Sequence, residues 1–113
     1  MLLKLDAAFE IVLGAALVVT SAAGALDGAD FPRPVGTVVL LVAGVALVLL
    51  GVAIWAGLIG IRQLAVGNAV SAIAGIVWLA GASGFSGAGV AVVAVAVVGL
   101  AGLAAAQAAT LRA

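Results

Sequence analysis

The longest uncharged stretch of the chain spans residues 34–61 and lies between Arg33 and Arg62. About 20 apolar residues in a helix cross the hydrocarbon core of a membrane, which is roughly 30 Å thick. This stretch therefore predicts a transmembrane helix over residues 35–61. A shorter apolar run predicts a first helix over residues 7–26. The chain enters it through Asp6, Ala7, Ala8 and Phe9, with Glu10 at or just inside the membrane interface.

The second half of the chain has no charge between residues 63 and 111, which is enough for two crossings and a turn. Four glycines interrupt this run between residues 81 and 89 and predict a break there. The expected helices are residues 64–82 and 89–110, with a short turn at residues 62–63 before them. No polar-apolar alternation typical of a membrane barrel is present. The pattern predicts an all-α integral membrane protein, a single domain of four transmembrane helices over residues 1–113.

The chain also aligns with itself at an offset of 53 residues. Residues 10–60 align with residues 63–113 without a gap, and 15 of the 51 aligned pairs are identical. A composition dominated by Ala, Val, Leu and Gly also produces chance identities, so the alternative is composition alone. The alignment predicts two tandem helical hairpins related by a pseudo-two-fold axis along the membrane normal.

Composition changes the picture mainly by exclusion. The chain is 68% hydrophobic and 7% charged, too few charges for a water-exposed surface, so the lipid bilayer is the expected surrounding. It contains no Cys, His or Tyr, which excludes disulfides and thiolate or imidazole metal sites, and we expect no cofactor. Four basic residues offer no patch for nucleic acid, and no catalytic constellation indicates an enzyme.

The basic residues also predict an orientation. With four crossings, Lys4, Arg62 and Arg112 lie on one side and Arg33 lies alone on the other. Because basic residues concentrate on the cytoplasmic side, we expect both termini in the cytoplasm, with the protein in a bacterial plasma membrane.

Glu10 is the sharpest candidate for chemistry, because an ionisable residue within a membrane helix indicates a functional site by default. The alternative is an interfacial carboxylate that contacts water or pairs with Arg62 or Arg112. Three uncharged polar side chains are expected in the same half of the bilayer and could complete a binding or proton site with Glu10, or join helices by hydrogen bonds. They are Asn68, Ser71 and Gln107.

Small residues predict how the helices pack. Glycines spaced along one helix face let two backbones approach closely, which is how helices associate in a lipid environment. The glycines expected at helix contacts are Gly14, Gly44, Gly51, Gly67, Gly75, Gly99 and Gly102. More small-residue surface is expected than one chain can cover, which predicts a homo-oligomer or a larger membrane complex.

Two families of small four-helix membrane proteins share features with the chain. The length and Glu10 in the first helix resemble small multidrug resistance proteins, which implies that Glu10 binds protons and cationic drugs. Glu10 lies nearer the helix end than that resemblance requires, and the aromatic residues of the drug pocket have no match. The segment at residues 34–37, with Gly44 after it, is similar to the helix 2 entry of dimeric fluoride channels, but Leu41 replaces the expected asparagine. Neither resemblance extends beyond one helix, and neither assigns a family.

The sequence thus favours a small polytopic membrane protein with a structural or accessory role, associating through helix faces rich in Gly and Ala. The alternative is a small proton-coupled or ion or solute transporter that uses Glu10 and takes a small cationic ligand. The position of the Glu10 side chain separates the two, since a carboxylate within a shared cavity favours transport.

Overall fold

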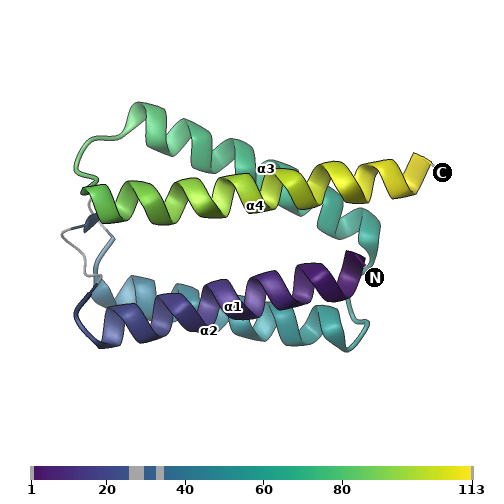
Figure 1. Cartoon of the computed structure of the whole chain (residues 1–113), viewed down its shortest axis with the longest axis horizontal. Helices are drawn as coiled ribbons and strands as arrows, with labels where there is room; N and C mark the ends of the chain where they lie inside the picture. The colour runs from purple at the N-terminus through teal and green to yellow at the C-terminus, as the bar shows by residue number, and fades with distance from the viewer. Residues whose placement is uncertain (1, 26–29, 33–34, 113) are drawn as a thin grey trace.

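The protein folds into four α-helices arranged as two hairpins. A computed structural model describes residues 2–25, 30–32 and 35–112, with the backbone only at residue 112. The helices are α1 (Leu2–Ala22), α2 (Thr37–Trp55), α3 (Ile61–Gly81) and α4 (Gly87–Arg112). Helix α1 packs against α2 and α3 packs against α4, with both chain ends at the same end of the molecule (Figure 1). The all-α prediction is confirmed.

Three of these helices are long and apolar enough to cross a membrane: α2, α3 and residues Gly87–Leu111 of α4. At about 1.5 Å per residue, the 19 residues of α2 extend over roughly 28 Å, close to the thickness of a hydrocarbon core. The chain is therefore an integral membrane protein by the length and composition of its helices. Helix α1 differs because Lys4, Asp6 and Glu10 lie in its first half.

The turn between the hairpins lies earlier than the sequence indicated. Helix α2 ends at Trp55, and Gly57 adopts a left-handed backbone conformation with φ 80°, which favours glycine. The amide of Gly60 then donates to the side-chain oxygen of Gln63 over 2.9 Å and caps α3. Arg62 and Gln63 consequently lie in the first turn of α3, so the prediction of a turn at these two residues was wrong.

Helix α1 begins at Leu2, five residues before the predicted start, and ends at Ala22 rather than at residue 26. Its end coincides with Gly24, whose φ of 80° takes the chain out of the helix. Because the helix starts early, Asp6 and Glu10 lie within it, and Asp6 is no entry residue. Two other helices differ from the prediction by one or two residues at the ends named here: α3 ends at Gly81, and α4 spans Gly87–Arg112.

Glycines bring α1 and α2 into close contact. A Cβ atom added at Gly14 would lie 2.5 Å from the carbonyl oxygen of Gly44, and one added at Gly44 would lie 2.6 Å from Val18. A Cβ at Gly51 would lie 2.8 Å from the carbonyl oxygen of Ala7. These distances leave no room for a side chain, so the first hairpin packs backbone against backbone as expected for helices in lipid.

The second hairpin uses its glycines differently. A Cβ at Gly75 would lie 2.5 Å from Val97, and Gly99 packs against the ring of Phe9 from the other hairpin. A Cβ at Gly67 or Gly102 would meet nothing within 4 Å. Open space adjoins both positions, so their packing against a helix of another chain stays a prediction.

The two hairpins meet at the end that carries the connections within each hairpin. The ring of Phe31 stacks on Trp78 with centroids 6.2 Å apart, and Phe85 meets Trp78 edge-on at 4.7 Å. Beside these rings the Ser86 hydroxyl donates to Asp30 Oδ1 over 2.5 Å, and the Ser86 amide donates to the Asp30 carbonyl oxygen over 3.0 Å. This end forms the first of two joints between the hairpins.

Candidate functional site

The second joint is a buried polar cluster centred on Asp6. Its Oδ2 accepts a hydrogen bond from Gln107 Nε2 over 2.5 Å and another from Asn68 Nδ2 over 2.8 Å. Asn68 Nδ2 also contacts Gln107 Oε1 at 3.1 Å. Asp6 and Gln107 are 0% exposed, and Asn68 is buried. Three helices, α1, α3 and α4, thus meet through one carboxylate and two amides.

Helix periodicity places Glu10 beside this cluster. Asp6 and Glu10 are four residues apart in α1 and therefore lie on one face of the helix, one turn apart. This face is buried along its length: Gly14 packs against α2, and Asp6 reaches Asn68 and Gln107 of the second hairpin. Asn68 lies two turns into α3, and Gln107 lies in the last two turns of α4. Antiparallel pairing of α3 with α4 brings these two amides to the same depth as Asp6.

Two carboxylate oxygens in this region lack any hydrogen-bond partner. They are Asp6 Oδ1 and Glu10 Oε2, and Glu10 is only 2% exposed. Among the described side chains neither carboxylate forms an ion pair. Arg62 is exposed, and Lys4 lies over the Trp55 ring at 5.0 Å from its centroid. Burying a charge without a partner costs free energy, so these two carboxylates are candidates for a functional site.

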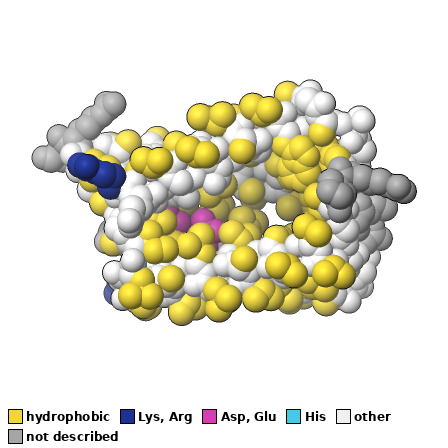
Figure 2. All heavy atoms as spheres, turned by 180° about the vertical axis from the view of Figure 1, so that it is seen from behind, with side chains coloured by type: hydrophobic (Ala, Val, Ile, Leu, Met, Phe, Trp, Pro, Cys, Tyr) yellow, Lys and Arg dark blue, Asp and Glu magenta, His cyan; other side chains and the backbone are white. Residues whose placement is uncertain are grey.

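Glu10 lines a cavity of about 420 Å³ between the hairpins. Asn68, Gln63 and Ser71 contribute the other polar side chains of its wall, and Ser71 is exposed to it. Gly67 also lines this cavity, without a side chain to fill it. In Figure 2 acidic side chains are visible at the bottom of a hollow between the two hairpins. The Glu10 cavity is therefore open space bordered by an unpartnered carboxylate.

An apolar cavity of about 310 Å³ adjoins the Glu10 cavity. Ser71 and Leu13 are among the residues that line both. The apolar cavity extends as far as Phe31 and Trp78, the rings of the first joint. The interior between the hairpins is thus polar near the chain ends and apolar toward the connecting loops.

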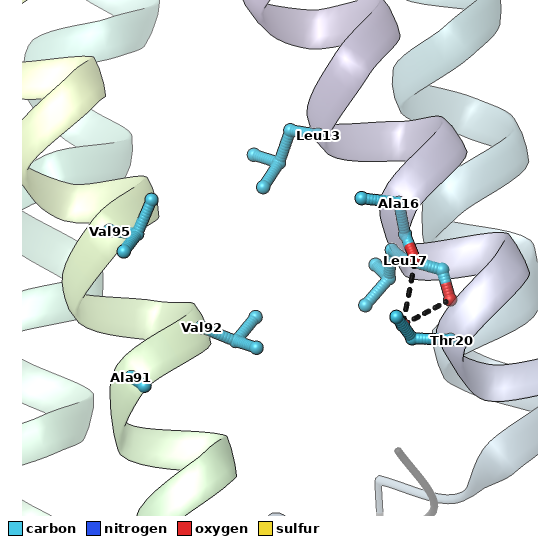
Figure 3. Close-up of a pocket in the computed structure, with 7 residues that line it drawn as sticks. All are labelled: Leu13, Ala16, Leu17, Thr20, Ala91, Val92 and Val95. Carbon is cyan, nitrogen blue, oxygen red and sulfur yellow. Dashed lines mark hydrogen bonds between the residues drawn. The ribbon is translucent and has the colours of Figure 1, made fainter. Parts of the chain in front are cut away.

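A third hollow, of about 250 Å³, lies along the outer seam between α1 and α4 (Figure 3). Its one polar side chain is Thr20, whose hydroxyl donates to the carbonyl oxygen of Ala16 over 2.7 Å. That hydroxyl is satisfied within its own helix, so the seam offers no polar group to a ligand. We find no chemistry there.

The residues predicted from sequence divide between these features. Asn68 and Gln107 are brought together, but around Asp6 and not around Glu10. Glu10 and Ser71 line one cavity with Asn68. The pairing of Glu10 with Arg62 does not occur, and the side chain of Arg112, the other predicted partner, lies outside the described residues.

Asp6 is the functional candidate that sequence reasoning missed. It was placed at the helix entry because the apolar run begins after it. A signal was present in its spacing of four from Glu10, which puts two carboxylates on one helix face, and in the number of amides expected at the same depth.

Chemically, the site offers carboxylate, amide and hydroxyl oxygens. Two buried carboxylates repel one another and are stabilised by protons or cations, so this arrangement suits binding of positive charge. No protein-family model, curated protein or solved structure matches the chain.

Proposed function

We propose that this protein is a small membrane transporter that binds a proton or a small cation at Glu10 and carries it between the two hairpins. The observation behind this proposal is a single one: Glu10 is 2% exposed to the surface, has an unpartnered oxygen, and lines a cavity of about 420 Å³. A carboxylate that served only as an interfacial charge would contact headgroup water or a basic side chain. The geometry favours transport over the accessory role that the sequence alone favoured.

In this proposal all four helices cross a bacterial plasma membrane, with both termini in the cytoplasm. The position of both chain ends at one end of the molecule supports an even number of crossings (Figure 1). The excess of basic residues at that end supports the orientation. Helix α1 contributes the fourth crossing because its glycine contacts keep it at the same depth as α2.

We also propose that the hairpins arose by duplication. Leu40 and Val93 are 53 residues apart and lie in the same buried cluster, and Ile54 and Gln107, also 53 apart, are both almost fully buried. This correspondence supports a pseudo-two-fold axis between the hairpins. Their packing has diverged, since Gly14 meets Gly44 whereas Gly67, its counterpart, adjoins open space.

Transport is tested in vesicles of purified full-length protein. An imposed proton gradient, with Na⁺, K⁺ or Mg²⁺ present in turn, should drive a flux that an internal pH-sensitive dye reports. Glu10→Gln should abolish this flux because the amide does not take up a proton near neutral pH and lacks the negative charge that attracts a cation. Thr20→Val is the matched control, since it changes a polar residue of the same helix whose hydroxyl bonds only to its own backbone.

A structural or accessory role is the second candidate, and one observation favours it. The Asp6 cluster joins three helices by side-chain hydrogen bonds, as polar residues do when they hold membrane helices together. Large apolar residues on the outer faces, such as Val38 and Val98, also suit association with other chains. Equal flux in native, Glu10→Gln and protein-free vesicles would remove the transport proposal and leave this one.

A further inference from the structure

We infer that Asp6 and Glu10 together bind one hydrated divalent cation, of the class of Mg²⁺ or Mn²⁺. This inference rests on the proposed function and names the ligand of the same site. It adds Asp6, which the Glu10 proposal does not use, and it fixes the charge of the ligand at two.

Charge balance carries the first step. Two carboxylates lie one turn apart on α1, both residues are buried, and each has a fully buried oxygen without a hydrogen bond: Asp6 Oδ1 and Glu10 Oε2. No described basic side chain compensates them, since Arg62 is exposed and Lys4 lies over Trp55. A single monovalent cation would leave one negative charge buried in the protein. One divalent cation neutralises both carboxylates.

The donor atoms carry the second step. Hard divalent cations prefer oxygen ligands, and Mg²⁺ in particular is often held by one or two carboxylates while it keeps several waters. No third acidic side chain joins the pair among the residues that the structure describes. The chain has no Cys or His, so softer metals such as zinc and copper find none of their preferred ligands.

The third step rests on the Glu10 cavity, because retained waters need space and hydrogen bonds. Glu10 lines this cavity, and Asp6 lies one helix turn away, outside its wall. Its volume of about 420 Å³ is far larger than a water occupies in the liquid, roughly 30 Å³. Asn68, Ser71 and Gln63 line it and can hydrogen-bond to the waters around the ion. A bare proton would use none of this space.

The test measures Mn²⁺ binding to the full chain in nanodiscs of phosphatidylcholine, whose headgroups carry no net charge. Electron paramagnetic resonance reports free Mn²⁺ during the titration. We expect one Mn²⁺ per chain, and Glu10→Gln or Asp6→Asn should each weaken binding by about tenfold or more, because each removes a charged ligand. Asp6→Asn keeps an acceptor oxygen for both amides, which preserves the joint.

A second pair of variants leaves both carboxylates in place. Gly67→Leu adds a side chain to the Glu10 cavity, where a Cβ meets nothing within 4 Å, and should weaken Mn²⁺ binding by about tenfold or more because the hydrated ion loses its space. Gly102→Leu is the matched control, because it also adds a leucine at an open helical position. Gly102 lines neither the Glu10 cavity nor the apolar cavity beside it, so this variant should bind Mn²⁺ as the native chain does.

The outcomes separate the inference from the function it rests on. Mn²⁺ binding that is unchanged in Glu10→Gln, or in Gly67→Leu, overturns the divalent site. Uptake of protons, Na⁺ or K⁺ that depends on Glu10 but is insensitive to Mn²⁺ also overturns it while the proposed function stands. If neither protons nor any of these cations bind in a Glu10-dependent way, both proposals fail.

Discussion

Replacing Asp6 by Asn should stabilise the folded protein even though Asp6 is the centre of a hydrogen-bonded joint. Asp6 Oδ2 accepts from Gln107 Nε2 at 2.5 Å and from Asn68 Nδ2 at 2.8 Å, and an asparagine oxygen at this position can accept both bonds. The substitution removes the negative charge and replaces the unpartnered Oδ1 by an amide nitrogen, whose buried N–H groups have no partner in the structure. Gln107→Met is the contrasting change, because it keeps the side-chain volume but removes the amide.

The magnitudes favour opposite signs for these two variants. Burying an unpaired ion costs several kcal/mol, and Asp6 is 0% exposed. Against this gain, a hydrogen bond to a charged group contributes about 1.5–3 kcal/mol and a neutral one about 0.5–1.5 kcal/mol, so two bonds lose roughly 2 kcal/mol in Asp6→Asn. The unpartnered amide N–H groups cost about 1 kcal/mol more, so we expect Asp6→Asn to stabilise by about 1 kcal/mol. Gln107→Met leaves Asp6 with one donor and should destabilise by about 1–3 kcal/mol.

The free energy of unfolding is measured by titrating sodium dodecyl sulfate into mixed micelles near neutral pH, with a chelator present so that bound cations do not stabilise the native chain. Helicity from circular dichroism reports the transition. A variant Asp6→Asn that is less stable than the native chain would refute the reasoning. That result would mean that the Asp6 carboxylate contributes net stability, and the joint between the hairpins would then be sufficient to explain its presence.

Three further results are expected. Gly14→Val should lower the free energy of unfolding by about 1–3 kcal/mol because the added side chain forces α1 away from α2. Gly102→Val should change it by less than about 0.5 kcal/mol, because open space adjoins Gly102. Equal effects of the two variants in the same detergent titration would contradict the packing of α1 on α2. Ser86→Ala should speed amide hydrogen exchange at the start of α4, because the hydroxyl accepts from a backbone amide there, and unchanged exchange would argue against this cap. The chain has no native cysteine, so a single introduced cysteine reports the topology. Ser83→Cys should react with an impermeant maleimide on intact cells, and Thr110→Cys should react only after permeabilisation, because the chain ends are expected in the cytoplasm. The reverse pattern would mean that the topology is inverted.

Helix number and class followed from the apolar runs, because their length against membrane thickness is a strong constraint. The helix ends did not follow as well. The end of α2 depends on the left-handed conformation of Gly57, and its sequence neighbours do not distinguish this glycine from Gly51, which packs within the same helix. Likewise hydropathy placed the start of α1 after Asp6, because the apolar run begins there, and it does not report the bonds of Asp6 to the other hairpin.

The candidate site was predictable in its residue types and only partly in its arrangement. Asn68 and Gln107 could be assigned to one half of the bilayer by counting residues from Arg62 and Arg112. Asp6 and Glu10 share one helix face, so which carboxylate the amides contact depends on the position of α1 along its axis. The glycine contacts between α1 and α2 help to set that position. The cavity beside Glu10 depends on how far apart the hairpins stand, a property of the two joints together.

The joint between the hairpins does not require the negative charge of Asp6. Asn68 and Gln107 already bond to each other at 3.1 Å, and a third amide at position 6 could accept the same two bonds without burying a charge. In a membrane protein a buried carboxylate lowers stability unless something positive accompanies it. Helix adhesion therefore accounts for the position of a polar side chain at residue 6 but leaves its ionisable group unexplained. A cation shared with Glu10 explains both, and it also explains why a cavity borders Glu10, one helix turn from Asp6, instead of a packed core.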